Sequence, residues 1–163
     1  MKTLLIVYHS MTGGTLQMAN AAAAGAARET ALRVRLMHAP AAQPADVLEA
    51  AGYLFATPEN LASMSGLMKD FFDRCYYAAL DQVNGRPYAC LVCAGSDGQG
   101  AVRQIDRIAT GLRLRPVAPA LVVCTHAQTP QQIAREKKIG EADLARCNEL
   151  GAALAAGLAL GIY

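Results

Sequence analysis

The sequence has no tryptophan, and aromatic residues make up only 6% of its 163 positions. Charged residues are also sparse at 17%, and 15 basic and 13 acidic side chains leave a net charge of +2. No basic stripe interleaved with aromatic residues is present, so nucleic-acid binding has little support. The densest cationic cluster, REKK at 135–138, is more typical of a solvated helix end than of a binding patch.

Long apolar segments are missing as well. The N-terminal apolar run breaks at His9 and Ser10, which makes it too short for the usual core of a signal peptide. The C-terminal LGAALAAGLALGIY falls short of the ~20 residues that a membrane-spanning helix needs. Hydrophobic residues nevertheless make up 53% of the chain, enough for a large core. We therefore expect one domain over residues 1–163, located in the cytoplasm and without membrane association.

The five cysteines do not predict a disulfide framework, because their number is odd and their spacing irregular. Cys90 and Cys93 form a C-x-x-C pattern, but they lie in YACLVCA, which is typical of a buried strand. Residues three apart on a strand point to opposite faces and lie about 10 Å apart. They could not bridge or share a metal without distortion, so we expect two buried thiols and no metal site.

Three signature motifs of phosphate chemistry are absent. The sequence has no GxxxxGK[ST] motif, which disfavours nucleoside triphosphate hydrolysis, and no GxGxxG motif, which disfavours a Rossmann dinucleotide site. No cysteine is followed six positions later by arginine, so thiol-phosphatase chemistry has no support either.

Strand-like and helical patterns alternate along the chain, which predicts an α/β fold: a parallel sheet with helices on both faces. The expected strands are 3–8, 32–39, 52–57, 87–95 and 117–124. The expected helices are 14–28, a short one within the loop 42–51, 63–80, 100–112, one starting at Thr129 and 141–158. Pro119 indicates that the first part of the last strand lies at an edge. The third helix carries an apolar stripe that we assign to the core, consisting of Met64, Leu67, Met68, Phe71, Phe72 and Cys75.

The loop after the first strand combines hydroxyls and glycines, reading Ser-Met-Thr-Gly-Gly-Thr over residues 10–15. The free N–H groups and the dipole of a following helix favour an anion there. Gly13 and Gly14 let the backbone approach it closely. Because the loop has no lysine or arginine, we expect a cofactor phosphate held by neutral donors. A capped turn without a ligand is the alternative.

Two more loops follow strands at the same end of the predicted sheet, where ligands of open α/β folds bind. Residues 57–66 read TPENLASMSG, in which Leu61 and Met64 could lie against a flat ring. Residues 94–100 read AGSDGQG, with three glycines that leave the backbone accessible. Ordinary turn chemistry is the alternative for each loop alone.

These motifs resemble the flavodoxin superfamily, in which the first loop has the form [ST]-x-T-G-x-T. The segment FATPENLASMSGLMKDFFDR is similar, more specifically, to a segment of the flavodoxin-like NAD(P)H:quinone oxidoreductases related to tryptophan-repressor-binding protein. The resemblance implies a three-layer flavodoxin-like fold, a five-stranded parallel sheet of order 2-1-3-4-5, and FMN as cofactor. It also implies that residues 10–15 bind the FMN phosphate and that the isoalloxazine ring lies between the other two loops.

The implied FMN-binding residues fall into these three groups. They are Ser10, Met11, Thr12, Gly13, Gly14 and Thr15; Thr57, Pro58, Glu59, Asn60, Leu61, Ser63 and Met64; and Ala94, Gly95, Ser96, Asp97, Gly98 and Gly100. Backbone N–H groups near 60–62 and 96–98 would stabilise charge on the reduced ring. No acid–base residue is nominated, because His9 and His126 are strand-end histidines that more often pack or face solvent.

The function that the resemblance implies is transfer of a hydride from NAD(P)H to flavin and then of electrons to a quinone or similar small acceptor. A non-catalytic FMN electron carrier that serves a redox protein is one alternative, and a regulatory domain without cofactor is another. Flavodoxins commonly place aromatic residues against the flavin and are strongly acidic. Here neither ring loop has an aromatic residue and the charge is +2, which favours the enzyme. The sequence leaves open whether the protein forms a homodimer.

Overall fold

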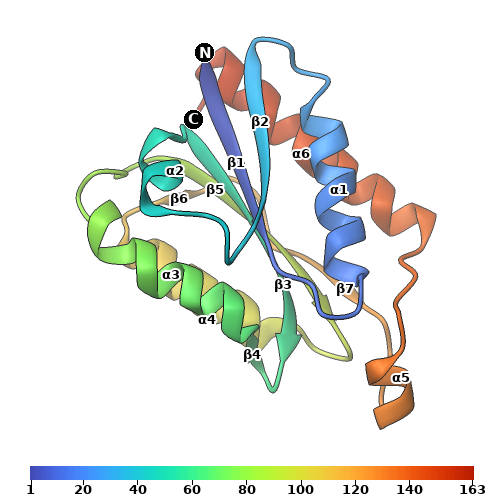
Figure 1. Cartoon of the computed structure of the whole chain (residues 1–163). Coiled ribbons are helices and arrows are strands. Elements are labelled where there is room, and N and C mark those ends of the chain that lie inside the picture. Colours follow the sequence, from blue (N-terminus) through green and yellow to red (C-terminus); the bar gives the residue numbers. More distant parts are fainter.

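The apolar runs of the sequence form a parallel sheet, seen in the computed structural model of residues 1–163 (Figure 1). Its order is β2-β1-β3-β5, and two short strands, β6 and β7, both pair with β5 at the far edge. A further short strand, β4, pairs antiparallel with the end of β3. The bounds are β1 Lys2–Tyr8, β2 Leu32–His38, β3 Gly52–Asn60, β4 Ser63–Met64, β5 Pro87–Ala94, β6 Arg115–Pro116 and β7 Leu121–Cys124.

The sequence predicts five strands, whereas the structure has seven. The predicted fifth strand, 117–124, is broken: β6 ends at Pro116 and β7 begins at Leu121. Pro119 lies in the gap and has no N–H to donate to a ladder, which accounts for the break. The other added strand, β4, forms because β3 runs on to Asn60 and the chain turns back at Leu61 and Ala62. The predicted strand order 2-1-3-4-5 is confirmed for the five sheet positions.

Helices cover both faces of the sheet (Figure 1). α1 (Gly14–Ala26) and α6 (Glu141–Leu160) pack on one face. α2 (Pro44–Glu49), α3 (Gly66–Ala79) and α4 (Gln99–Gly111) pack on the other. The five-residue α5 (Pro130–Ala134) projects beyond the carboxyl ends of the strands. It begins with the predicted capping box, in which Thr129 and Gln132 satisfy each other's backbone N–H groups.

The strands divide their side chains between two cores, as the two-residue period of a strand requires. In β1, Leu4 and Ile6 pack in the core under α1 and α6, while Leu5 and Val7 pack in the core under α3 and α4. The C-x-x-C pair divides in the same way, because Cys90 lies in the α3–α4 core and Cys93 in the α1–α6 core. The prediction of two free thiols on opposite faces is confirmed, and all five cysteines are unbridged.

The apolar stripe assigned to the third helix is buried with one exception. Leu67 has 43% of its surface exposed, so its assignment to the core is wrong. It is the second residue of α3, in the first turn of the helix, and its side chain is left partly open to solvent. The other members lie in the core, and Phe55 of β3 packs edge-on against Phe72 with ring centroids 5.0 Å apart.

α1 and α6 touch backbone to backbone through two glycines. A Cβ atom added at Gly151 of α6 would lie 2.0 Å from the carbonyl oxygen of Ala22 in α1. A Cβ atom added at Gly25 of α1 would lie 1.9 Å from the carbonyl oxygen of Asn148 in α6. This contact fixes the position of α1, and with it the loop that leads into α1. None of the helices combines the length and apolar character needed to cross a bilayer.

Candidate functional site

A cavity of about 460 Å³ opens at the carboxyl ends of β1, β3 and β5, a size within the usual range for small-molecule sites. It lies where the three loops singled out in the sequence converge with the segment after β7. Its walls are Ser10, Met11, Thr12, Gly14, Thr15, Pro58, Glu59, Asn60, Leu61, Cys93, Ala94, Gly95, Thr125, Ala127, Ile133 and Lys137. No aromatic residue is among them.

Most of the residues expected to bind FMN meet in this cavity, but eight do not line it. Gly13, Thr57, Ser63, Met64, Ser96, Asp97, Gly98 and Gly100 lie outside it. Thr57 is fully buried and bonded to Ser65 below the loop. Ser63 is turned away and donates to Gln104 at 2.9 Å. Met64 and Gly100 line a second cavity on the other side of the turn between β3 and β4. Met64 therefore does not face the ring position expected from the sequence.

The loop of residues 10–15 has the geometry of an anion cradle. Gly13 caps α1 with a left-handed φ of 87°, which a side chain rarely adopts. The Ser10 hydroxyl accepts the Gly13 N–H at 3.1 Å and so fixes the turn. The N–H groups of Met11 and Thr12 donate to no protein atom, and the first-turn N–H groups of α1 are free in the way of any helix start. Residues that line the cavity therefore carry several unpaired donors.

Thr15 provides the sharpest test of whether this loop suits a phosphate. Its Oγ1 is the one buried side-chain oxygen or nitrogen in the structure without a hydrogen-bond partner. A buried unpaired hydroxyl costs about 1–3 kcal/mol, so such groups are rare and call for a partner. Gly14 beside it leaves no room for a side chain, because a Cβ atom would lie 2.7 Å from the Cys93 sulfur. The unpaired donors of this loop and the cavity of about 460 Å³ beside it therefore fit the phosphate of FMN.

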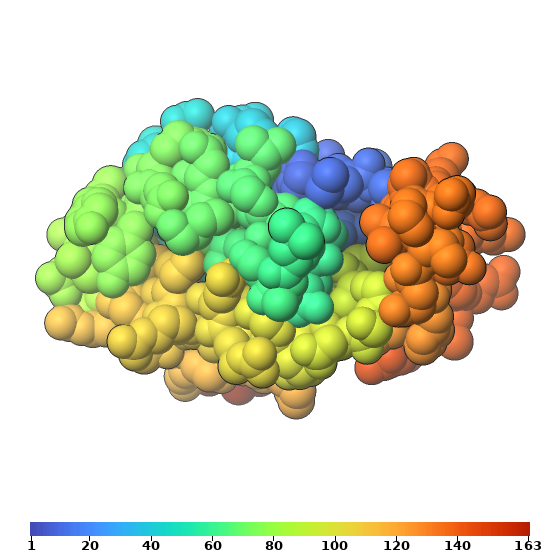
Figure 2. Space-filling view, turned by 90° about the horizontal axis from the view of Figure 1, so that it is seen from below, coloured from blue at the N-terminus to red at the C-terminus, as the bar shows by residue number.

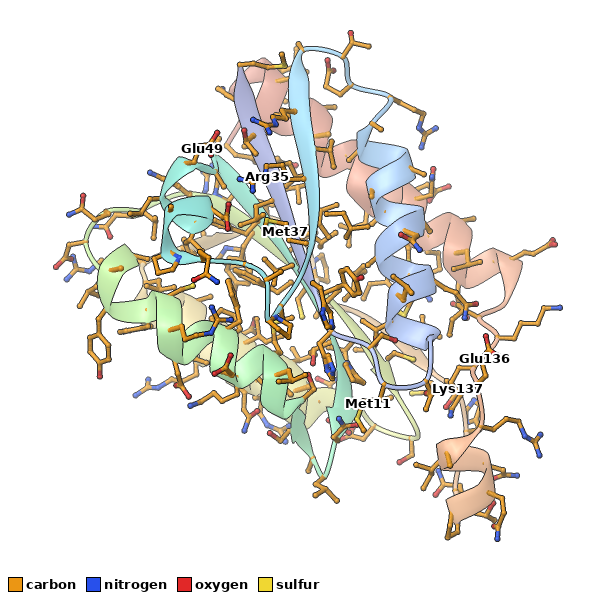
Figure 3. The ribbon with its side chains drawn as sticks, viewed as in Figure 1. Met11, Arg35, Met37, Glu49, Glu136 and Lys137 are labelled. Carbon is orange, nitrogen blue, oxygen red and sulfur yellow. The ribbon has the colours of Figure 1, made fainter.

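Lys137 is the main feature of the site that sequence reasoning missed. Its Nζ lies 3.3 Å from Thr12 Oγ1, and its backbone N–H donates to the Thr12 carbonyl at 2.8 Å. The ammonium is held in place by the carbonyls of Ile133 and Arg135, at 2.8 and 2.5 Å. Figure 3 shows Lys137 beside the start of α1, with Met11 across the cavity. The loop therefore has a cation beside it, so the expectation that it offers neutral donors alone is wrong.

Gln17 of α1 explains why a residue so distant in sequence reaches the loop. Its side-chain amide donates to the Lys137 carbonyl at 2.6 Å and accepts the Ile139 N–H at 3.0 Å. This two-sided clamp attaches the segment after α5 to the first turns of α1. Arg135, Glu136 and Lys138 of the REKK cluster are exposed just after α5, as the sequence predicts for a solvated helix end. Lys137 alone is docked on the loop, and no local pattern in the sequence indicates this contact. The segment 135–139 is called the strap below.

The turn between β3 and β4 carries backbone strain. Leu61 and Ala62 have φ values of 52° and 60°, in the left-handed region that normally takes glycine or asparagine. Leu61 is fully exposed at the tip. Together with Met11 and Ile133, which are 67% and 56% exposed, it gives the cavity mouth an apolar rim.

Glu59 has a structural task that the sequence did not reveal. Its carboxylate accepts the N–H groups of Gly98 and Ala101 at 2.9 and 3.2 Å, and so caps the start of α4. The Gly98 N–H is therefore engaged, which contradicts the expectation that it faces the ring. In return, the contact fixes the 94–100 loop against β3.

Burial shifts the pKa of two titratable side chains near the cavity, His9 and Cys93. Burial, aided by the nearby His38, lowers the pKa of His9, whose Nδ1 is 2.8 Å from the Ser65 hydroxyl. His9 is packed beneath the loop, in agreement with the sequence, and His126 is exposed. Burial raises the pKa of Cys93 to about 11, so its thiol adds no negative charge beside the cradle. No group of His, Cys, Asp and Glu side chains is placed to hold a metal.

Comparison with known proteins agrees with the geometry. The family model described as NADPH-dependent FMN reductase matches residues 40–129, more than half of the chain. A flavodoxin of Aquifex aeolicus (strain VF5) is 34% identical over 61% of this chain and 52% of its own length. An NAD(P)H dehydrogenase (quinone) of Acidithiobacillus ferrooxidans (strain ATCC 53993 / BNL-5-31) is 31% identical over 45% of this chain and 47% of its own length. The match thus spans about half the length of these curated relatives.

Solved structures match over nearly the whole chain. A flavodoxin from the domain Archaea superposes with a TM-score of 0.80 at 20% identity, covering 96% of this chain and 98% of that one. A WrbA-like flavodoxin from Agrobacterium tumefaciens gives a TM-score of 0.71 at 18% identity, covering 97% and 98%. At this identity the neighbours show the fold, which is flavodoxin-like as the sequence predicts.

Proposed function

The chain belongs to the NADPH-dependent FMN reductase family, within the flavodoxin-like FMN-binding proteins, and on that premise we propose that it oxidises NAD(P)H and reduces a small acceptor such as a quinone, with FMN as its cofactor. The observation that carries the proposal is the buried Thr15 hydroxyl, left unpaired at the start of α1 and facing a cavity large enough for a ligand. We further propose that residues 1–163 act as one FMN-binding domain.

The chain's own groups would bind the phosphate end of the cofactor. The N–H groups of Met11 and Thr12 and the hydroxyls of Thr12 and Thr15 would donate to phosphate oxygens, as donors at helix starts commonly do. The Lys137 ammonium would balance part of the charge. Bound there, FMN would supply the two-electron chemistry that no side chain of this protein offers.

The walls beyond the phosphate cradle would place the ring. Pro58, Asn60 and Leu61 lie on one side, and Ala94 and Gly95 on the other. The residues on both sides are aliphatic, polar or small, so no stacked aromatic residue would cover the ring. This leaves space for a second flat ring, such as nicotinamide or a quinone, and supports an enzyme over a dedicated carrier. A homodimer and a redox protein partner remain further proposals.

The decisive experiment is rapid mixing of the FMN-loaded protein with NADH or NADPH. We expect loss of flavin absorbance near ~450 nm, and, with a benzoquinone acceptor, ping-pong steady-state kinetics, since reductant and acceptor would use the same ring face in turn. If neither nucleotide bleaches the flavin while a reductase protein does, the chain is an electron carrier and the proposal fails.

Lys137 offers a test of the phosphate assignment. We expect Lys137→Met to weaken FMN binding about tenfold, or ~1.4 kcal/mol, because the variant loses one cation beside the dianion. Riboflavin, which has no phosphate, should bind both proteins equally. Lys138→Met is the matched control, since Lys138 is exposed and its side chain makes no hydrogen bond or ion pair. Flavin fluorescence titration measures all of these affinities, and an equal loss for riboflavin would contradict the assignment.

A further inference from the structure

A second cavity, of about 480 Å³, lies between α3 and α4. Its walls are Ala62, Met64, Lys69, Gly100, Arg103, Gln104, Arg107 and Ile108. Three of these residues are cationic and none is acidic. Lys69 is partly neutralised by Asp73, whose carboxylate is 2.7 Å away, so the arginines supply most of the uncompensated charge.

Arg103 and Arg107 are unusual among the arginines of this chain. Apart from the remote Arg135, every other arginine side chain makes a hydrogen bond, an ion pair or a contact with an aromatic ring. Arg103 and Arg107 make none, and both line this one cavity. They stand four residues apart on α4 and therefore lie side by side, where like charges repel unless an anion lies between them. Their free guanidinium donors match phosphate oxygens in geometry and charge.

We call this second cavity, which holds Arg103 and Arg107, the cationic cavity, and the cavity at residues 10–15, where FMN is proposed to bind, the flavin cavity. The two share one wall, the β3–β4 hairpin. Asn60 and Leu61 face the flavin cavity, and Ala62 and Met64 face the cationic one. Gln104 fixes the hairpin by accepting from the Ser63 hydroxyl and the Met64 N–H, each at 2.9 Å. In Figure 2, which looks onto this end of the sheet, the teal hairpin lies between the orange strap on one side and green α3 and yellow α4 on the other.

We propose that the cationic cavity binds the phosphate groups of the nicotinamide dinucleotide, with Arg103 and Arg107 clamping the 2′-phosphate of NADPH. This rests on the proposed function: a dinucleotide whose nicotinamide ring lay in the flavin cavity would reach Arg103 and Arg107 by crossing the shared hairpin wall. A concave cavity with two free guanidinium groups suits a compact dianion. The exposed Leu61 tip is the point that the dinucleotide crosses.

The test uses the FMN-loaded protein and two non-redox probes, adenosine 2′,5′-bisphosphate and 5′-AMP, titrated by calorimetry. We expect the bisphosphate to bind more tightly than 5′-AMP. The double variant R103Q/R107Q should lose about tenfold in bisphosphate affinity per guanidinium and raise KM for NADPH without changing FMN affinity. R33Q/R146Q is the matched control, because it removes two exposed, ion-paired arginines at β2 and α6. It should change neither the bisphosphate affinity nor the KM for NADPH.

The outcomes separate this inference from the proposed function. If NADPH reduces the flavin but R103Q/R107Q behaves as the wild type, the cavity is not the phosphate site and the inference fails alone. If the bisphosphate binds through the arginines while NADPH leaves the flavin oxidised, the phosphate site stands and the proposed function fails. If R103Q/R107Q instead shifts the sedimentation coefficient from dimer to monomer, the cavity is an interface between two copies, which also overturns the inference.

Discussion

Replacing Thr12 with glutamate is expected to abolish FMN binding. The new carboxylate would stand at the centre of the cradle, where a phosphate dianion has to approach. It would also capture the Lys137 ammonium, which lies 3.3 Å from the Thr12 hydroxyl in the wild type. Unfavourable contact between like charges costs several kcal/mol, and the loss of the cation adds to it. Titration of the apoprotein with FMN measures the effect, which should exceed a hundredfold.

Thr12→Gln is the matched control for this variant. It has the size of glutamate without the charge, so it should weaken FMN binding far less than Thr12→Glu. Thr12 lies in a half-buried loop, where either side chain fits without disturbing the core. In the wild type, FMN should bind much more tightly than riboflavin. Equal affinities for the two flavins would mean that residues 10–15 do not hold the phosphate.

The second large effect concerns stability. Gly151→Ala should lower the free energy of unfolding by ~3 kcal/mol, because its Cβ atom would lie 2.0 Å from the Ala22 carbonyl oxygen. The atom in the way belongs to the backbone of α1 and cannot rotate aside as a side chain could, so α1 and α6 must move apart along their length. For a chain of this size, the melting temperature should fall by roughly 10 °C. Gly25→Ala should act in the same way, through the carbonyl of Asn148.

Gly66→Ala is the control for the stability prediction. A Cβ atom at Gly66 meets nothing within 4 Å, and its φ is not positive. This substitution should leave stability unchanged or raise it by about 0.4–1 kcal/mol. Thermal unfolding followed by circular dichroism compares the variants. A loss at Gly66 as large as that at Gly151 would show that glycine replacement itself, rather than the contact between α1 and α6, is responsible.

The sequence predicts the element order and the hydroxyl- and glycine-rich turn at the start of α1 because both are encoded locally. A strand reveals itself through its apolar run, and the cradle is six consecutive residues that end at a helix start. Pro119 accounts for the break in the last strand. Where the two pieces begin and end depends on which residues of β5 they pair with, and the sequence does not show this. Leu67 fits the helical period of its stripe, and only the tertiary arrangement shows that nothing covers it.

The missed parts of the site arise from contacts between residues far apart in the chain. Lys137 meets Thr12 across 125 positions, through a clamp made by Gln17. Glu59 lines the cavity, yet its bonds to the start of α4 cross 39 and 42 positions. Single-sequence patterns report periodicity and turn chemistry over a few residues, so neither contact leaves a local signal.

The strap that carries Lys137 also bears on the order in which the molecule assembles. Contacts between residues far apart in sequence form late, because the chain between them must first be ordered. The cradle at residues 10–15 leaves the ribosome well before its cation and the clamp partners at 137–139. Cofactor uptake is therefore expected to follow completion of the fold and to stabilise it by mass action, rather than to template the folding of the N-terminal half.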